Sequence, residues 1–125
     1  MKNKLRRMVI NDRIYLYRIQ KRYVSPLQGW VILKVFLEGY RLTPLVVECL
    51  VAEDLILGNP LFTGTKLFNK NTQAFCEVNL NYPRFIRELI ECGFSRGWTG
   101  IEKIDKQDGL VYLEELGYDI SPLQS

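Results

Sequence analysis

The chain has 125 residues, of which 47% are hydrophobic and 25% are charged, and its formal net charge is +3. These proportions exclude an intrinsically disordered chain and predict one domain, residues 1–125, that is large enough to bury a core. The apolar runs are far shorter than the roughly 18 residues of a membrane span, and the basic N-terminus lacks the apolar segment of a secretory signal. We therefore expect a cytoplasmic protein without membrane contact.

The first part of the chain, residues 8–80, has the two-residue alternation of apolar and polar side chains that is typical of β-strands. The alternation runs through the segment 14–24 and, after a turn, through the segment 30–39. One face of 30–39 is fully apolar and the other is half apolar, which predicts a central strand covered on both sides. The segment 40–54 continues extended, and the segment 61–80 predicts a hairpin.

Pro44 and the residues between the arms of the hairpin add local detail. Proline has no backbone N–H to donate to a neighbouring strand, so the strand in 40–54 is expected to begin after Pro44 or to lie at the edge of the sheet there. The turn of the hairpin is expected at NKNT, residues 69–72, because asparagine and threonine favour turns.

The last part of the chain, residues 83–117, changes to the 3.6-residue period of amphipathic helices. The first helix is expected over 83–97. Pro83 suits the first position of this helix, where the missing N–H is not needed. Gly97 suits the position just past the end of the helix, where the backbone often adopts the left-handed conformation. Gly93 inside this helix costs roughly 1 kcal/mol relative to alanine, so another group is expected to pack closely against it.

A second helix is expected over 106–116, with Asp105 as its N-cap. Gly117 would end it, and Tyr118 would then pack back on Leu113 as in a Schellman motif. Strands followed by helices predict an α+β fold: a mostly antiparallel five- or six-stranded sheet followed by two C-terminal helices packed on it. The expected core residues are Leu16, Val31, Leu33, Val35, Leu37, Val47, Val78, Phe85, Leu89, Ile90, Leu110 and Leu113.

Histidine is absent, and the chain has three cysteines, Cys49, Cys76 and Cys92. Without histidine, Ser–His and Cys–His catalytic pairs are impossible, and three thiols are too few for an ordinary four-ligand structural zinc site. Cys49 and Cys76 fall in apolar strands, whereas Cys92 lies beside the apolar stripe of its helix and is expected to be the most exposed. We therefore expect reduced thiols, no metal, no cofactor and no catalytic site.

The stretch GNPLFTGTK, residues 58–66, looks at first sight like a phosphate-binding loop. Such a loop requires G-x-x-x-x-G-K followed by serine or threonine, with a helix that begins there. In this chain five residues instead of four separate the two glycines, the threonine precedes the lysine, and the residues that follow predict a strand. These departures favour an ordinary connecting loop.

Basic side chains are concentrated at the N-terminus, where residues 1–22 contain eight of them and one acidic residue. Tyr15, Tyr17 and Tyr23 lie in the same region. Arginine and lysine neutralise phosphates and exposed tyrosines stack on bases, so this region predicts a nucleic-acid interface. Alternatively, the tyrosines pack in the core and the cations protect an edge strand from aggregation. The candidate nucleic-acid-binding residues are Arg6, Arg7, Arg13, Arg18, Lys21 and Arg22.

The segment FSRGWTG, residues 94–100, is a candidate protein-binding site. Phe94, Arg96 and Trp98 are of the aromatic and arginine types that are enriched in protein–protein interfaces. The alternative interpretation is that Trp98 covers the hydrophobic core beneath the helix.

The run NYPRFIRELI, residues 81–90, together with the Gly97-Trp98 pair, is similar to small uncharacterised bacterial proteins, a likeness that implies no activity. Because catalytic motifs are missing, we expect a small intracellular protein-binding module, such as an inhibitor, an immunity-type protein or an accessory subunit. The alternative is an accessory protein that binds nucleic acid through its basic N-terminal region. Both self-association and the identity of the partner are left open.

Overall fold

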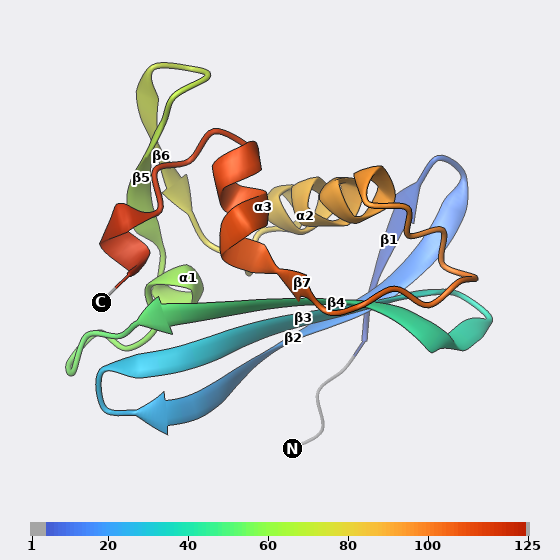
Figure 1. Cartoon of the computed structure of the whole chain (residues 1–125), viewed down its shortest axis with the longest axis horizontal. Coiled ribbons are helices and arrows are strands. Elements are labelled where there is room, and N and C mark those ends of the chain that lie inside the picture. The colour runs from blue at the N-terminus through green and yellow to red at the C-terminus, as the bar shows by residue number, and fades with distance from the viewer. Residues whose placement is uncertain (1–4, 125) are drawn as a thin grey trace.

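The computed structural model describes residues 5–124 and has the α+β architecture that the sequence predicts (Figure 1). A five-stranded sheet has the strand order β1-β2-β3-β4-β7, and a separate two-stranded sheet pairs β5 with β6. The strands are β1 (Arg6–Ile10), β2 (Arg13–Ser25), β3 (Gln28–Leu37), β4 (Tyr40–Ala52), β5 (Thr65–Asn69), β6 (Ala74–Val78) and β7 (Gln107–Asp108). The helices are α1 (Pro60–Thr63), α2 (Pro83–Ser95), α3 (Gly109–Glu115) and the 3-10 turn η1 (Ser121–Leu123).

Strands β1 to β4 form an antiparallel meander, and β7 joins its edge in parallel to β4. The hairpin β1–β2 turns at Asn11 and Asp12, which have φ values of 52° and 64°. Positive φ at both central residues is what a tight two-residue hairpin needs, and asparagine and aspartate tolerate it best after glycine. Strand β3 lies between β2 and β4, so the predicted central position of the segment 30–39 is confirmed.

Strand β4 contains Pro44 and still forms a regular ladder with β3. β7 pairs only with Val47 and Glu48 of β4, so Pro44 lies on a stretch of β4 whose outer edge has no neighbouring strand. A proline costs no ladder hydrogen bond at such an edge. The edge position that the sequence suggested for Pro44 is therefore correct.

The predicted hairpin 61–80 forms over a shorter range and outside the main sheet. Its first residues belong to the short helix α1, because Asn59 Oδ1 accepts a hydrogen bond from Leu61 N and Pro60 occupies the first helical position. The hairpin β5–β6 then pairs from Thr65↔Val78 to Asn69↔Ala74. The strand count of five in the main sheet agrees with the lower of the two predicted numbers.

Helix α2 begins at Pro83 and ends as predicted. Gly97 has a φ of 96°, and Trp98 N donates to Gly93 O at 3.0 Å, which closes a Schellman motif. A Cβ atom added to Gly93 would lie 2.6 Å from Leu45 Cδ2, so the expected close neighbour of this glycine is β4.

Helix α3 begins later than the sequence indicates. Asp108, not Asp105, is the N-cap, and its Oδ1 atom accepts from Leu110 N at 2.9 Å. Gln107 and Asp108 pair with Val47 and Glu48 of β4 in an extended conformation, so the helix cannot include them. The predicted end is correct: Gly117 has a φ of 100°, and Tyr118 N donates to Leu113 O.

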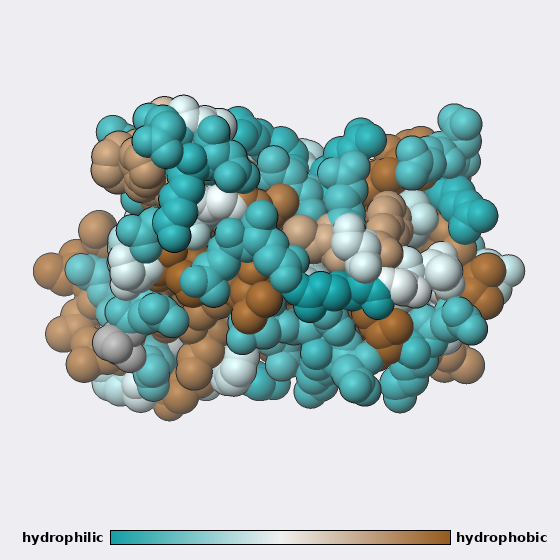
Figure 2. All heavy atoms as spheres, turned by 45° about the horizontal axis from the view of Figure 1, so that its top comes forward, coloured by the Kyte–Doolittle hydropathy of each residue, from teal (hydrophilic) through white to brown (hydrophobic). Residues whose placement is uncertain are grey.

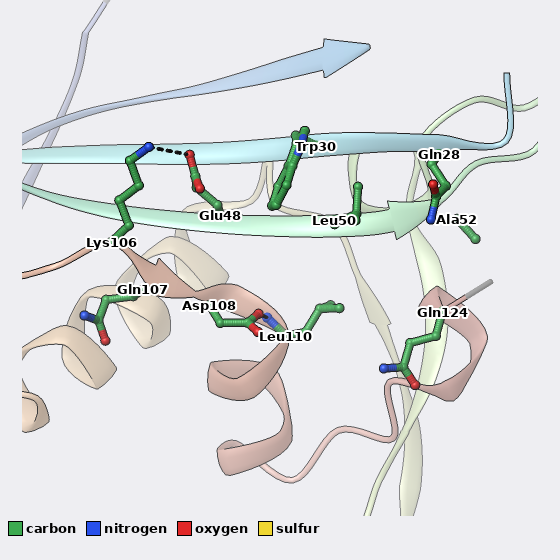
Figure 3. Close-up of a pocket in the computed structure, with 10 residues that line it drawn as sticks. All are labelled: Gln28, Trp30, Glu48, Leu50, Ala52, Lys106, Gln107, Asp108, Leu110 and Gln124. Carbon is green, nitrogen blue, oxygen red and sulfur yellow. Dashed lines mark hydrogen bonds and ion pairs between the residues drawn. The ribbon is translucent and has the colours of Figure 1, made fainter. Parts of the chain in front are cut away.

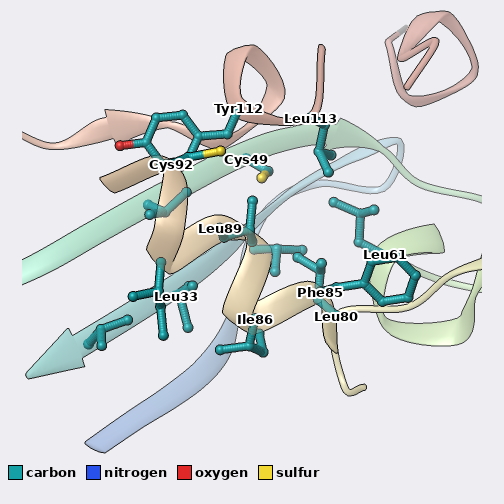
Figure 4. Close-up of a cluster of buried hydrophobic side chains, with 14 of the residues drawn as sticks. Leu33, Cys49, Leu61, Leu80, Phe85, Ile86, Leu89, Cys92, Tyr112 and Leu113 are labelled. Atoms are coloured by element: carbon teal, nitrogen blue, oxygen red, sulfur yellow. The ribbon is translucent and has the colours of Figure 1, made fainter. Parts of the chain in front are cut away.

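The hydrophobic core lies between the five-stranded sheet and the helices α2 and α3 (Figures 1 and 4). All of the expected core residues are buried except Leu16 and Leu110, which are half-buried. Leu16 follows Tyr15 and precedes Tyr17, and these two tyrosines face the helices. Because neighbouring residues of a strand point to opposite faces, Leu16 faces away from the core.

The other face of the five-stranded sheet carries no helix or second sheet built from residues 5–124 (Figure 1). Its side chains from β2, β3 and β4 are mostly half-buried by one another. The prediction that 30–39 is covered on both sides is therefore wrong for the described chain. We call this surface the open face. No helix within residues 5–124 is long and apolar enough to cross a membrane.

Candidate binding surfaces

Two of the three thiols, those of Cys49 and Cys92, are buried. Burial raises the pKa of Cys49 to about 12 and that of Cys92 to about 11, so both stay protonated and weakly nucleophilic at neutral pH. The expectation that Cys92 is the most exposed cysteine is wrong, since it is buried where α3 packs against α2, and Cys76 is the half-buried one. In the described part of the chain, no three side chains of the types His, Cys, Asp and Glu come together as metal ligands.

A pocket of about 520 Å³ opens beside β4 where the two-residue strand β7 ends (Figure 3). Trp30 and Leu50 form part of its apolar wall, and Gln107 is among the hydrogen-bonding residues that line it. Its two carboxylates have structural partners: Asp108 caps α3, and Glu48 Oε2 lies 3.8 Å from Lys106 Nζ. The pocket is therefore a recess with apolar and hydrogen-bonding walls, and both of its carboxylates already have partners within the chain.

The stretch 58–66 is a connecting loop that carries α1. Asn59 is buried, its side chain caps α1, and its Nδ2 atom donates to Glu53 Oε2 at 3.0 Å. Lys66 follows in strand β5, opposite Glu77. The lysine that a phosphate loop would use therefore lies in a strand and not at the start of a helix.

The candidate protein-binding segment 94–100 turns its two aromatic rings toward the core, while Ser95, Arg96, Gly97 and Thr99 are exposed. Trp98 is 1% exposed, its Nε1 atom donates to Thr43 O at 3.0 Å, and its ring stacks on Phe94 with 5.9 Å between centroids. Arg96 is bonded to Glu115 and lies over the Tyr112 ring. Trp98 thus covers the core, which is the alternative interpretation of this segment, and its side chain is not offered to a partner.

The candidate nucleic-acid-binding residues are divided between the two faces of β1 and β2. Arg6 faces the helices and its Nη1 atom donates to Asn81 O at 3.4 Å. Arg13 and Lys21 lie on the same side, and the Lys21 ammonium is 5.2 Å from the Phe62 ring centroid. Alternation of side chains along the strands separates these three residues from Arg7, Arg18 and Arg22, which belong to the open face.

The tyrosines of the same region are also divided. Tyr15 and Tyr17 are buried in the core, as the alternative interpretation of the basic segment proposed, and Tyr23 is exposed. Aromatic rings on the open face come instead from β3. Trp30 lies beside Arg22, whose guanidinium carbon is 5.6 Å from the ring centroid, and Phe36 lies beneath Lys34 at the same distance.

The open face therefore carries a band of cations across three adjacent strands. We call Arg7, Arg18, Arg22 and Lys34 the basic band. None of the four forms an ion pair within the described residues. Lys34 was not among the sequence candidates. It lies on the half-apolar face of the segment 30–39, and only the structure shows that this face is open.

Exposed apolar side chains gather at one end of the sheet, on the β2–β3 turn and on the loop between β4 and α1 (Figure 2). The loop residues Leu55, Ile56 and Leu57 are 73%, 91% and 70% exposed. Glu53 N donates to Leu27 O at 2.9 Å and joins the two segments. We call the six apolar residues of this end the apolar tip; they are Tyr23, Val24, Leu27, Leu55, Ile56 and Leu57.

The loop of the apolar tip is held in a defined conformation. Asp54 and Gly58 exchange two backbone hydrogen bonds of 3.0 and 2.9 Å, and Gly58 has a φ of 83°. Asp54 Oδ1 accepts from the backbone N–H groups of Ile56 and Leu57, and these bonds lower the pKa of the Asp54 carboxyl below its usual value. The three apolar side chains are thus presented by a closed turn.

The Glu53 side chain, which accepts from Asn59, lies against Gly29, where a Cβ atom would collide with it. The base of the loop is therefore packed on the β2–β3 hairpin, and the two halves of the apolar tip are fixed relative to each other. Sequence reasoning missed this surface, although LIL, residues 55–57, between Asp54 and Gly58 is a short apolar run inside a turn signal.

Comparison of the chain with protein-family models, with curated protein sequences and with solved structures finds no match.

Proposed function

We propose that this protein is a protein-binding module that docks through its apolar tip. The observation that carries the proposal is the exposure of Leu55, Ile56 and Leu57 on a turn that its own hydrogen bonds close. Contiguous apolar side chains at this exposure are uncommon on monomeric soluble proteins and mark interaction sites. Apolar side chains held in place before binding lose little conformational freedom on association, which favours affinity.

The shape and surroundings of the apolar tip favour a partner with a concave apolar surface that is bordered by polar groups. A protruding turn fits a concave apolar surface, in which its side chains would be fully desolvated as the centre of an interface. Charged groups border the tip on both sides, since Lys21 and Arg22 precede Tyr23, and Asp54 precedes Leu55. These groups fit a polar rim around the apolar centre. By docking in this way, the protein would either inhibit its partner or assemble with it as an accessory subunit.

The proposal is tested with the variant Ile56→Asp, which puts a charge at the centre of the tip without touching the core. Leu42→Asp is the matched control, because Leu42 is 89% exposed in β4 and lies outside the tip. Tagged wild type and both variants are incubated with extract of the cells that produce the protein, and bound proteins are quantified. We expect a stoichiometric partner that is retained by the wild type and Leu42→Asp, and whose retention falls at least tenfold with Ile56→Asp.

Two further measurements complete the experiment. Sedimentation of the purified wild type shows whether the partner is a second copy of the chain, in which case Ile56→Asp alone becomes monomeric. Co-sedimentation with lipid vesicles tests whether the tip inserts into a bilayer. Equal retention of every protein by the wild type and both variants, or binding to vesicles that Ile56→Asp abolishes, would reject a protein partner at the tip.

A further inference from the structure

The basic band brings like charges together at the middle of the open face. Arg18 and Lys34 are direct cross-strand partners in the antiparallel pair β2–β3, so their side chains lie next to each other. Like charges directly opposite each other in a sheet are destabilising. The Nε atom of Arg18 is also buried without a hydrogen-bond partner among the described residues. The uncompensated pair of cations favours a site that is completed by negative charge from outside the described residues.

Arg7 and Arg22 extend this charge along the sheet. Arg7 of β1 pairs with Leu16 of β2, and Leu16 is the neighbour of Arg18 on the open face of β2. Arg22 lies on the same face of β2, two side-chain positions beyond Arg18. Neighbouring positions on one face of a strand are about 7 Å apart, so the band spans about 20 Å. A ligand that neutralises all four cations must therefore be an extended polyanion and not a single phosphate or carboxylate.

Aromatic rings accompany the cations. Arg22 lies 5.6 Å from the Trp30 ring centroid, and Arg41 and Lys34 lie 5.9 and 5.6 Å from that of Phe36. Trp30 is half-buried and also forms part of the wall of the 520 Å³ pocket (Figure 3). The pocket lies toward β4 and the band toward β1, so Trp30 stands between a cationic surface and a recess with hydrogen-bonding groups.

We propose that the open face binds single-stranded nucleic acid. The phosphates lie along Arg7, Arg18, Lys34 and Arg22, and one base stacks on Trp30 with its edge in the adjacent pocket. Cations that follow a backbone, combined with aromatic rings that stack on unpaired bases, are the features by which proteins bind single strands. An acidic peptide would satisfy the cations but would leave the Trp30 ring and the pocket without a planar group, so the observations favour the nucleic acid.

The first test measures the fluorescence anisotropy of a labelled single-stranded deoxythymidine oligonucleotide at several salt concentrations. The double variant Arg18→Gln/Lys34→Gln removes two cations of the band and relieves their repulsion, so it is expected to fold. We expect at least tenfold weaker binding at low salt. The slope of log affinity against log salt should fall in magnitude by about 1.4, because each neutralised phosphate of a single strand contributes about 0.7.

Lys66→Gln/Lys70→Gln is the matched control, because both lysines are exposed in and after β5 and are remote from the open face. This control loses the same net charge and should bind as the wild type does. Binding that falls equally in both double variants would overturn the proposal, because it would reflect net charge alone. Polyglutamate or duplex DNA that competes as well as the single strand would overturn it too.

The second test uses the two tryptophans of the chain, Trp30 and Trp98. In Trp98→Phe the fluorescence comes from Trp30 alone and should be quenched when the oligonucleotide binds. In Trp30→Phe it comes from the buried Trp98 and should stay constant. Should Trp98→Phe fail to fold, the difference between the wild type and Trp30→Phe gives the same information. A Trp30 signal that the bound oligonucleotide leaves unchanged would reject base stacking.

This site is independent of the apolar tip, and its failure can be told apart from failure of the proposed protein-binding function. Ile56→Asp should bind the oligonucleotide as the wild type does, and Arg18→Gln/Lys34→Gln should retain the protein partner. Loss of both oligonucleotide binding and partner binding in Ile56→Asp, or in Arg18→Gln/Lys34→Gln, would mean that the two surfaces are one interface, which contradicts the inference.

Discussion

The two faces of the five-stranded sheet are built from the same strands and differ in what covers them. On the face toward α2 and α3, Tyr15 and Tyr17 of β2 are almost completely buried, whereas their neighbours Leu16 and Arg18 on the open face are half-buried. The centre of the covered face is apolar and its cations Arg6, Arg13 and Lys21 lie toward its margins, whereas Arg18 and Lys34 lie side by side in the middle of the open face. The comparison teaches that the covered face supplies most of the stability of the fold, which leaves the open face free to carry cations whose mutual repulsion lowers stability slightly.

The largest difference is expected between the two tryptophans. Trp98→Ala leaves a cavity in the core beneath α2 and should lower the free energy of unfolding by about 3–5 kcal/mol. Trp30→Ala should cost about 1 kcal/mol, the central value for point substitutions, because Trp30 is only half-buried on the open face. Urea denaturation of both variants measures the two values. Equal losses would mean that Trp30 is as important for folding as the core, and the contrast between the faces would fail.

Gly93→Ala tests how tightly the covered face is packed. The substitution should gain roughly 1 kcal/mol of helix propensity, but its Cβ atom would lie 2.6 Å from Leu45 Cδ2 in the core. Overpacking of this kind costs about 1–3 kcal/mol, so we expect net destabilisation of up to about 2 kcal/mol in urea denaturation. Adding Leu45→Val should recover part of the loss. A stabilised single variant would show that Leu45 moves aside freely.

Alkaline pH should lower the free energy of unfolding, because the thiol of Cys49 is buried on the covered face. Burial raises the pKa of Cys49 to about 12, so above about pH 9 the unfolded chain loses this proton before the folded chain does. The free energy of unfolding therefore falls as pH rises through this window, by about 1 kcal/mol per pH unit. Denaturation at about pH 8 and about pH 10 measures the change. Cys49→Ala should show a smaller fall, and an identical fall would assign the effect to other groups.

The smallest expected effect is on the open face itself. Lys34→Glu places a carboxylate opposite Arg18 and should raise the free energy of unfolding by about 0.2–1 kcal/mol while it abolishes oligonucleotide binding. Lys66→Glu is the control with the opposite sign, because Lys66 lies opposite Glu77 in the β5–β6 hairpin. It should destabilise the protein by a similar amount. Lower stability in Lys34→Glu would show that the two cations do not repel each other.

Local chemistry made much of the fold predictable. Pro83, Gly97 and Gly117 have single physical roles at helix ends, and the structure uses them in those roles. The start of α3 was misplaced because an N-cap can be any suitable residue before an apolar stripe, and both Asp105 and Asp108 qualify. Only the pairing of Gln107 and Asp108 with β4 selects the second. Local signals therefore specify an element more reliably than its boundary.

The candidate sites were harder to predict because they depend on which face is covered. Alternation in β2 defines two sets of side chains but does not say which set faces the helices, and for this reason Leu16 was placed in the core. The same ambiguity kept Lys34 out of the candidate cations and grouped Arg6 with Arg7. The apolar tip unites residues 23–27 and 55–57, which only the folded chain brings together.

The amino-acid sequence by itself determined the α+β class, the central position of β3, the ends of α2 and the absence of histidine chemistry, because each depends on residue type and on short-range periodicity. The tertiary structure alone decided which face of the sheet is covered, that Trp98 lies in the core, and that the cations of three strands form one band. These features depend on contacts between residues far apart in the chain. The free energy of burying apolar surface, and not any local preference, selects among them.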